Sequence, residues 1–280
     1  MDGAEIAVVV PTYRRTDRAL RMIDALEAQT VDPSRFEVLV VDDRSDDGTY
    51  DLLVKRAETS HLAVRVLTTE RNGGPAGARN LGWRTATAPL VAFVDDDCVP
   101  DPMWLAAGLD ALATDTRAGV LQGRTLRPDG ATLGDWSIWR EVLQASPYFE
   151  GCNLFLRRAA LEATGGFDEA LGLYGEDTML GWAAIAAGWE RGFVDAAVVR
   201  HDVEERGVRW RVRWGYRERR NLMAVAARHP EFRQQAFWRL SCSPFAATNR
   251  SVGTVPSLRL RNSLCKLFFL RRWFWFSFMP

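Results

Sequence analysis

Acidic side chains follow several short apolar runs of this sequence, in an arrangement that could hold a cation. Asp95, Asp96 and Asp97 come directly after one such run. Alternate side chains of a strand share a face, so we expect Asp95 and Asp97 on one side and Asp96 on the other. Paired carboxylates repel unless a positive charge lies between them, and oxygen ligands suit Mg²⁺ or Mn²⁺. The alternative interpretation is that these acids end a strand and cap the following helix.

Two further stretches have the chemistry of a nucleotide site. Asp42 and Asp43 end another apolar run, where a carboxylate can accept hydrogen bonds from a base edge or a ribose hydroxyl. An acidic turn is the alternative for this pair. The small residues of 72–77 permit a close approach of the backbone to a ligand, and Arg79 follows them with a guanidinium that can meet phosphate oxygens. A plain loop is the alternative there.

The elements that must position these residues alternate between strands and helices. We predict strands at 6–10, 36–43, 62–68 and 89–97, and helices at 18–29, 49–59 and 75–85. Pro11 is expected to end the first strand because proline cannot continue a central strand. Thr16 or Asp17 is the expected cap of the first helix. This alternation predicts right-handed crossovers, a mostly parallel sheet and a ligand site at the carboxyl ends of the strands.

The second part of the chain is expected to extend the same α/β domain. It contains a predicted helix at 102–112, a strand at 119–126, a tryptophan-rich loop at 128–150, a strand and short helix within 152–169, and a helix from about 176 to 188. We expect one domain over 1–236, with a nucleotide-binding half at about 1–115 and an acceptor half at 116–236. A basic aromatic tail, 237–280, follows it.

Composition excludes several classes of protein. The 280 residues include 36 basic and 36 acidic side chains, and 47% of positions are hydrophobic, which excludes a chain disordered throughout. The formal net charge of zero gives no reason to expect a nucleic-acid partner. Four widely spaced cysteines without a C-x-x-C motif argue against a disulfide framework or a structural zinc site. The acidic amino terminus lacks the features of a secretory signal, so we expect a cytoplasmic protein.

Seven motifs together resemble the family-2 glycosyltransferases of the GT-A fold, a Rossmann-like architecture. They are VVVPTYRR, VVDDRSDDGT, NGGPAGARNLG, FVDDD, GCNLFLRR, GGFDE and GEDT, which occur in the family's order across roughly residues 5–230. The resemblance implies an inverting transfer of a sugar from a nucleotide-diphosphate sugar to an acceptor hydroxyl, with Mg²⁺ or Mn²⁺. A degenerate nucleotide-sugar-binding protein and a sugar nucleotidyltransferase are the alternatives. The second usually carries a glycine-rich, basic amino-terminal loop, which VVVPTYRR lacks.

The resemblance also implies roles for individual residues. The residues that resemble the nucleotide-sugar site are Pro11, Thr12, Tyr13, Asp42, Asp43, Arg79, Asp95 and Asp96. Asp95 and Asp97 resemble the metal-binding Asp-x-Asp pair, with Asp97 as the direct ligand. His201 occupies a place where related enzymes can supply a third metal ligand, and an ordinary hydrogen-bonded histidine is the alternative.

Asp177 resembles the family's catalytic carboxylate, and Glu176 is the second candidate. Both lie in a predicted first helical turn, where free N–H groups and the helix dipole favour the ionised carboxylate that a base requires. Ordinary helix N-terminal acids are the alternative. Asn153 is expected either to contact the acceptor or to be a buried structural residue, and Trp182 is expected on the acceptor side.

The sequence also departs from the family pattern. Met179 and Ala183 flank Trp182 where the family often has an acid and an arginine, which puts the usual acceptor contacts in doubt. The segment 234–239 does not reproduce the Gln-x-x-Arg-Trp element of processive synthases, so we expect transfer of a single sugar.

The carboxyl-terminal tail differs in charge from the rest of the chain. All acidic residues precede Phe237 and seven basic residues follow it, so the two parts carry −7 and +7. The segment 266–279 combines aromatic residues with arginines, which suits peripheral contact with a membrane at its cytoplasmic face. A helix docked on the domain is the alternative. Membrane contact would fit a lipid-linked acceptor in cell-envelope or polysaccharide synthesis.

Overall fold

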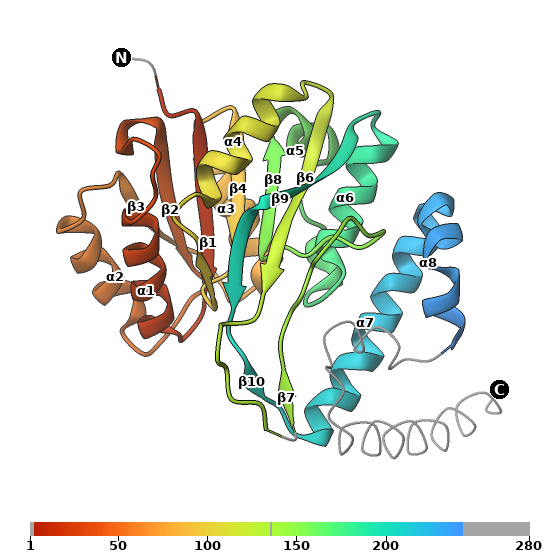
Figure 1. Ribbon diagram of the computed structural model, residues 1–280. Coiled ribbons are helices and arrows are strands. Elements are labelled where there is room, and N and C mark those ends of the chain that lie inside the picture. Colours follow the sequence, from red (N-terminus) through yellow and green to blue (C-terminus); the bar gives the residue numbers. More distant parts are fainter. Residues whose placement is uncertain (1–2, 135, 243–280) are drawn as a thin grey trace.

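The computed structural model describes residues 3–134 and 136–242, and Figure 1 shows them as one α/β body. Its centre is an eight-stranded sheet with the strand order β3-β2-β1-β4-β8-β6-β9-β5. Helices cover both faces of the sheet. The segment 266–279, to which we assigned membrane contact, lies outside the described residues. The proposed domain boundaries near 115 and 236 stay predictions.

The first half of the sheet is parallel, as the alternating pattern predicted. Its strands are β1 (Ile6–Thr12), β2 (Phe36–Asp42), β3 (Val64–Thr68) and β4 (Leu90–Val94), joined through the helices α1 (Thr16–Glu27), α2 (Thr49–Glu58) and α3 (Pro75–Thr85). A short 3₁₀ helix, Pro33–Arg35, precedes β2. The central strands β1 and β2 are buried along their whole length, which explains their continuous apolar runs.

The second half of the sheet is mixed, and over the whole sheet four of the seven strand pairs are parallel. β8 (Asn153–Arg157) runs antiparallel to both β4 and β6 (Ala118–Leu126). β9 (Glu190–His201) is parallel to β6, and β5 (Cys98–Pro100) pairs antiparallel with β9. This arrangement lets β5, which follows β4 closely in sequence, cross to the far edge of the sheet.

The remaining elements complete the two layers around the sheet. They are the helices α4 (Trp104–Thr114), α5 (Arg158–Thr164), α6 (Glu176–Ala186), α7 (Val208–Arg228) and α8 (Pro230–Cys242), the 3₁₀ helix Glu169–Leu171, and a small sheet of β7 (Ser137–Ile138) and β10 (Glu204–Glu205). Within the described residues, no helix is both long and apolar enough to cross a membrane.

Two hydrophobic cores lie on opposite faces of the sheet. Val8 of β1 packs in the core that includes Leu53 and Leu105, from the α2 and α4 side. Its neighbour Val9 faces the other core, which includes Trp83 of α3 and Leu180 of α6. The alternation of side chains along β1 thus distributes its apolar residues between both layers of helices.

Two expected boundaries near the first strand were wrong. β1 continues through Pro11 to Thr12, because its pairing with β4 ends at Val9 and only the β2 side continues. A proline there removes no hydrogen bond to β4. Helix α1 begins at Thr16 instead of residue 18 and its cap position is Arg15, so neither Thr16 nor Asp17 caps it. The Thr16 hydroxyl instead bonds to the hydroxyl of Thr49 at 2.7 Å.

Helix α3 packs closely on β1 because Gly82 has no side chain. A Cβ added there would lie 2.4 Å from Cγ1 of Val9, whereas one added at Gly77 of the same helix would meet nothing closer than 3.8 Å. We expect Gly82→Ala to lower the free energy of unfolding by about 1–2 kcal/mol, because overpacking outweighs the gain in helix propensity. Gly77→Ala is the matched control and should gain up to about 1 kcal/mol. Urea unfolding of both variants measures the difference, and equal stabilities would contradict this account of the packing.

Candidate functional site

Loops at the carboxyl ends of β1 and β2 and before α6 carry unusual backbone geometry. Among the described residues, positive φ occurs at three positions that are not glycine: Arg14 at 52°, Arg44 at 62° and Tyr174 at 74°. They follow β1, follow β2 and precede α6, respectively. Such conformations are costly and tend to cluster at functional sites, which is consistent with a ligand site at this edge of the sheet.

The three consecutive aspartates after β4 do not continue the strand. β4 ends at Val94, and the chain turns before β5 begins at Cys98. Asp95 pairs with Arg79 at 2.6 Å, whereas Asp96 and Asp97 share the guanidinium of Arg15 at 3.0 and 2.9 Å. The expectation that Asp95 and Asp97 share one face was therefore wrong, because it assumed the alternation of a regular strand.

Arg15 and Arg18 form the basic side of this cluster, and our sequence analysis did not single them out. Besides its two aspartates, Arg15 contacts Glu204 at 3.3 Å, and Arg18 contacts the same carboxylate at 2.8 Å. Glu204 lies in β10, far along the chain. The place of Arg15 at the end of VVVPTYRR, beside Thr12 and Tyr13, was the available signal in the sequence.

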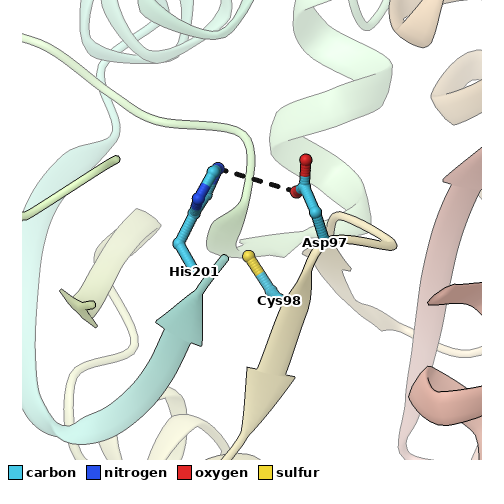
Figure 2. Close-up of side chains that lie close together, drawn as sticks. All are labelled: Asp97, Cys98 and His201. Carbon is cyan, nitrogen blue, oxygen red and sulfur yellow. Dashed lines mark ion pairs between the residues drawn. The ribbon is translucent and has the colours of Figure 1, made fainter. Parts of the chain in front are cut away.

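Asp97, Cys98 and His201 bring three potential metal ligands together (Figure 2). Their ligand atoms all lie within 4.8 Å of one another. Oδ1 of Asp97 is buried, has no hydrogen-bond partner among the described residues and lies 3.6 Å from Nε2 of His201. The other ring nitrogen of His201 lies 2.8 Å from the carbonyl oxygen of Asp202. A proton on Nδ1 would leave Nε2 free to bind a metal, so these residues fit a divalent cation.

The predicted ligand Asp95 lies outside this group of three, since its carboxylate is held by Arg79. The thiol of Cys98 was not among the predicted ligands. Burial and the neighbouring Cys152 thiol raise the pKa of Cys98 well above its usual range, so the side chain is a neutral thiol in the free protein.

The residues predicted for a nucleoside pocket lie at the ends of β1 and β2. Asp43 accepts hydrogen bonds from the backbone N–H groups of Gly73 and Gly74 at 3.0 and 2.7 Å, and from the hydroxyl of Thr69 at 2.9 Å. Asp43 thus fastens the glycine-rich loop to the end of β2. Asp42 accepts hydrogen bonds from the backbone and hydroxyl of Ser45 and closes a turn there.

The remaining residues predicted for this pocket come from the end of β1. Pro11 and Thr12 are buried, and the Thr12 hydroxyl donates to Asp96 at 2.7 Å. Tyr13 is 39% exposed and Arg14 lies over its ring. The structure therefore joins the end of β1 to the aspartates that follow β4.

Arg79 links the aspartates after β4 to the start of α6. Its guanidinium is buried and bridges Asp95 at 2.6 Å and Glu176 at 3.0 Å. A Cβ added to Gly151 would lie 2.8 Å from Cζ of Arg79, so this close approach requires glycine. The second carboxylate oxygen of Glu176 has no hydrogen-bond partner among the described residues.

Asp177 lies beside Arg79 and Glu176 at the start of α6. Its carboxylate accepts hydrogen bonds from the backbone N–H groups of Gly151 at 2.8 Å and Thr178 at 2.7 Å. Even so, burial and the neighbouring Glu176 and Glu150 raise the pKa of Asp177 well above its usual range. The helix N-terminus was expected to favour the ionised carboxylate, but burial and the neighbouring negative charges outweigh its effect on the pKa. The Asp177 carboxylate is therefore a stronger proton acceptor.

A polar cavity of about 30 Å³ adjoins Asp177, which is room for about one water molecule. Apart from Asp177, the charged and aromatic residues of its wall were not among the predicted site residues. Its lining includes Arg140, Glu150, Tyr174, Asp177 and Glu218. These side chains come from the loop before β8, from the start of α6 and from α7, so the cavity exists only in the folded chain.

The two residues considered for the acceptor side are both buried. Asn153 is fully buried: its amide donates to the carbonyl oxygens of Arg124 and Ala197, and its oxygen accepts from the Trp104 indole at 2.9 Å. This is the structural alternative that the sequence had left open. Trp182 is 2% exposed because it lies on the apolar face of α6 that packs into the core. Its indole N–H donates to the carbonyl oxygen of Pro147.

Comparison with solved structures identifies the fold. The mannosyltransferase PcManGT of Pyrobaculum calidifontis, solved in complex with GDP-Man and Mn²⁺, superposes with a TM-score of 0.69 at 24% identity. The superposition covers 98% of this chain and 84% of that one. The predicted α/β GT-A fold is confirmed.

Sequence comparisons then identify the family. The family model of glycosyl transferase family 2 matches residues 7–167. Glycosyltransferase AglE of Haloferax volcanii is 27% identical over 59% of this chain and 57% of its own length. Validoxylamine A glucosyltransferase of Streptomyces hygroscopicus subsp. limoneus is 29% identical over 91% of this chain and 62% of its own length. The chain belongs to glycosyl transferase family 2, and it spans about 60% of these two relatives.

The bridge that Arg79 forms predicts strong energetic coupling between Arg79 and Glu176. Arg79→Gln should lower the free energy of unfolding by about 3–5 kcal/mol, because it leaves buried carboxylates without their cation. Adding Glu176→Gln should recover at least about 1 kcal/mol, since one of those charges is removed. Urea unfolding of the single and double variants gives the coupling energy. Strict additivity of the two substitutions would contradict the bridge.

Proposed function

We propose that this protein transfers a single sugar from a nucleotide-diphosphate sugar to an acceptor hydroxyl, with inversion and with a divalent cation. The observation that carries the proposal is that Arg79 joins two sets of residues, since its guanidinium bridges Asp95, after β4, and Glu176, at the start of α6. One set is the Asp97 and His201 pair, which fits a cation, and the other is Asp177 at the start of α6, whose pKa is raised. Membership of glycosyl transferase family 2 supports the same reaction.

Asp177 is the proposed base. It takes the proton of the acceptor hydroxyl, whose oxygen bonds to the anomeric carbon while the bond from that carbon to the nucleoside diphosphate breaks. This single displacement inverts the anomeric centre. The hydrogen bonds from Gly151 and Thr178 hold the carboxylate in position.

Asp97 and His201 are the proposed cation ligands, and Asp43 with the loop that it fastens is the proposed nucleoside side. A bound Mg²⁺ or Mn²⁺ would neutralise the negative charge that a departing nucleoside diphosphate acquires. The solved complex of PcManGT with GDP-Man and Mn²⁺ supports this part of the proposal. Arg79 is a positioning residue, since its guanidinium is already shared by Asp95 and Glu176.

The proposed acceptor is a saccharide or lipid-linked hydroxyl of cell-envelope or polysaccharide synthesis, reached at the cytoplasmic face of the membrane. The basic and aromatic composition of 266–279 supports this assignment.

Asp177→Asn tests the proposed base. We expect it to lower metal-dependent turnover of the preferred nucleotide sugar by about 10²–10⁴-fold, because Asn cannot accept the proton. Donor-induced thermal stabilisation should persist, since the donor side is intact. The assay screens UDP- and GDP-linked hexoses with Mn²⁺, and Glu162→Gln on the exposed side of α5 is the control. Donor binding without turnover in the unaltered protein would instead favour a nucleotide-sugar sensor.

The raised pKa of Asp177 predicts the pH dependence of the reaction. A base works only when deprotonated, so kcat/KM should fall as the pH decreases. The midpoint of this fall should lie at a pH well above the usual aspartate pKa of about 4. Glu150→Gln removes a neighbouring negative charge that raises this pKa, and should therefore move the acid limb to lower pH. The exposed Glu162→Gln should leave the limb in place. A limb that shifts equally in both variants would argue against Asp177 as the titrating base.

A further inference from the structure

The geometry around His201 points to a metal preference that family membership does not supply. We propose that Cys98 adds a thiolate ligand to the cation site, so that Asp97, Cys98 and His201 together bind a thiophilic divalent cation such as Zn²⁺ or Co²⁺. This inference rests on the cation site of the proposed function. It adds a ligand that the carboxylate motif does not contain.

The β5–β9 ladder holds this set of ligands. Cys98 and His201 are direct partners in an antiparallel pair, and such partners project from the same face with Cβ atoms about 4.5–5.5 Å apart. The backbone N–H of Asp202 donates to the carbonyl oxygen of Asp97 at 2.8 Å, which fixes the turn against the end of β9. Cys98 and His201 therefore start from paired strands and Asp97 from a turn that is hydrogen-bonded to the end of β9. Figure 2 shows the thiol directed toward the gap between the other two side chains.

The burial of Asp97 and Cys98 beside the partly buried His201 favours a bound cation over separate roles. Asp97 is 8% exposed and its Oδ1 lacks a hydrogen-bond partner among the described residues, which is costly for a buried carboxylate. Arg15 and Arg18 both contact its other oxygen, Oδ2, whereas Oδ1 lies on the side of His201 and Cys98. Cys98 is 2% exposed and borders the same space.

The types of ligand determine which cations this site binds most strongly. Mg²⁺ prefers oxygen ligands, whereas Zn²⁺ and Co²⁺ bind imidazole and thiolate strongly. One carboxylate, one imidazole and one thiolate are three protein ligands, which leaves a further position for water or a phosphate oxygen. On coordination the Cys98 thiol loses its proton to solvent and its sulfur bonds the metal. A thiophilic cation would then compete with Mg²⁺ or Mn²⁺ for this site.

Cys152 provides the matched control. It is also a buried free cysteine, 4% exposed, and it lies near enough to Cys98 to influence its pKa, yet it is not part of the ligand group. If Cys98 merely fills the core, the two thiols should respond alike to a metal. If Cys98 is a ligand, only its removal should change metal binding.

Cobalt titration of the full chain tests the inference without a glycosyl transfer assay. Co²⁺ should produce a thiolate-to-cobalt charge-transfer band in the near ultraviolet, which Cys98→Ser abolishes and Cys152→Ser retains. Cys98→Ser should also weaken Zn²⁺ binding by about tenfold or more, and should change Mg²⁺ binding by less than about twofold. Circular dichroism establishes that each variant is folded.

A second measurement on the unaltered protein covers the case in which Cys98→Ser fails to fold. After brief exposure to an alkylating agent under mild denaturant, mass spectrometry should find Cys98 protected by Zn²⁺ and not by Mg²⁺. Absence of both the cobalt band and this protection overturns the inference. If Mn²⁺-dependent turnover is normal in the same preparation, the proposed function stands while the thiolate ligand does not.

Discussion

Two arginines hold together a group of carboxylates that would otherwise repel one another. Arg79 is buried between Asp95 and Glu176, and Arg15 lies between Asp96 and Asp97. Each guanidinium joins segments that are distant in the sequence, so the two sets of ion pairs determine how the carboxyl ends of the strands meet. Buried carboxylates without these cations would be protonated or would force the loops apart.

The mixed half of the sheet determines which residues surround those charges. Because β8 runs antiparallel between β4 and β6, the residues just before β8 return to the site. Gly151, one of these residues, contacts both Arg79 and Asp177 there. Because β5 pairs with the end of β9, Cys98 lies opposite His201. A parallel continuation of the first half would have produced neither juxtaposition. The surroundings of Arg79 and of His201 therefore depend on strand order.

Local signals predicted the elements well where a single strong feature sets each boundary. Helix α3 spans Pro75–Thr85, as expected, because glycine precedes it and proline begins it. Local signals failed where a neighbour decides the outcome. Pro11 continues a strand because β4 has already ended its pairing, and the aspartates after Val94 form a turn because β5 begins at once on another edge. Neither reason can be found within a short window of sequence.

The sequence by itself determined the family, the fold and the residue types of the site, because motif order and the alternation of strands and helices are properties of the chain alone. Tertiary structure alone decided the partners of each side chain. Trp182 was expected on the acceptor side, and Asn153 either there or in the core, and the fold buries both and satisfies their polar atoms internally. Whether a polar group meets a ligand or another part of the protein depends on distances between remote segments, and long-range packing sets those distances.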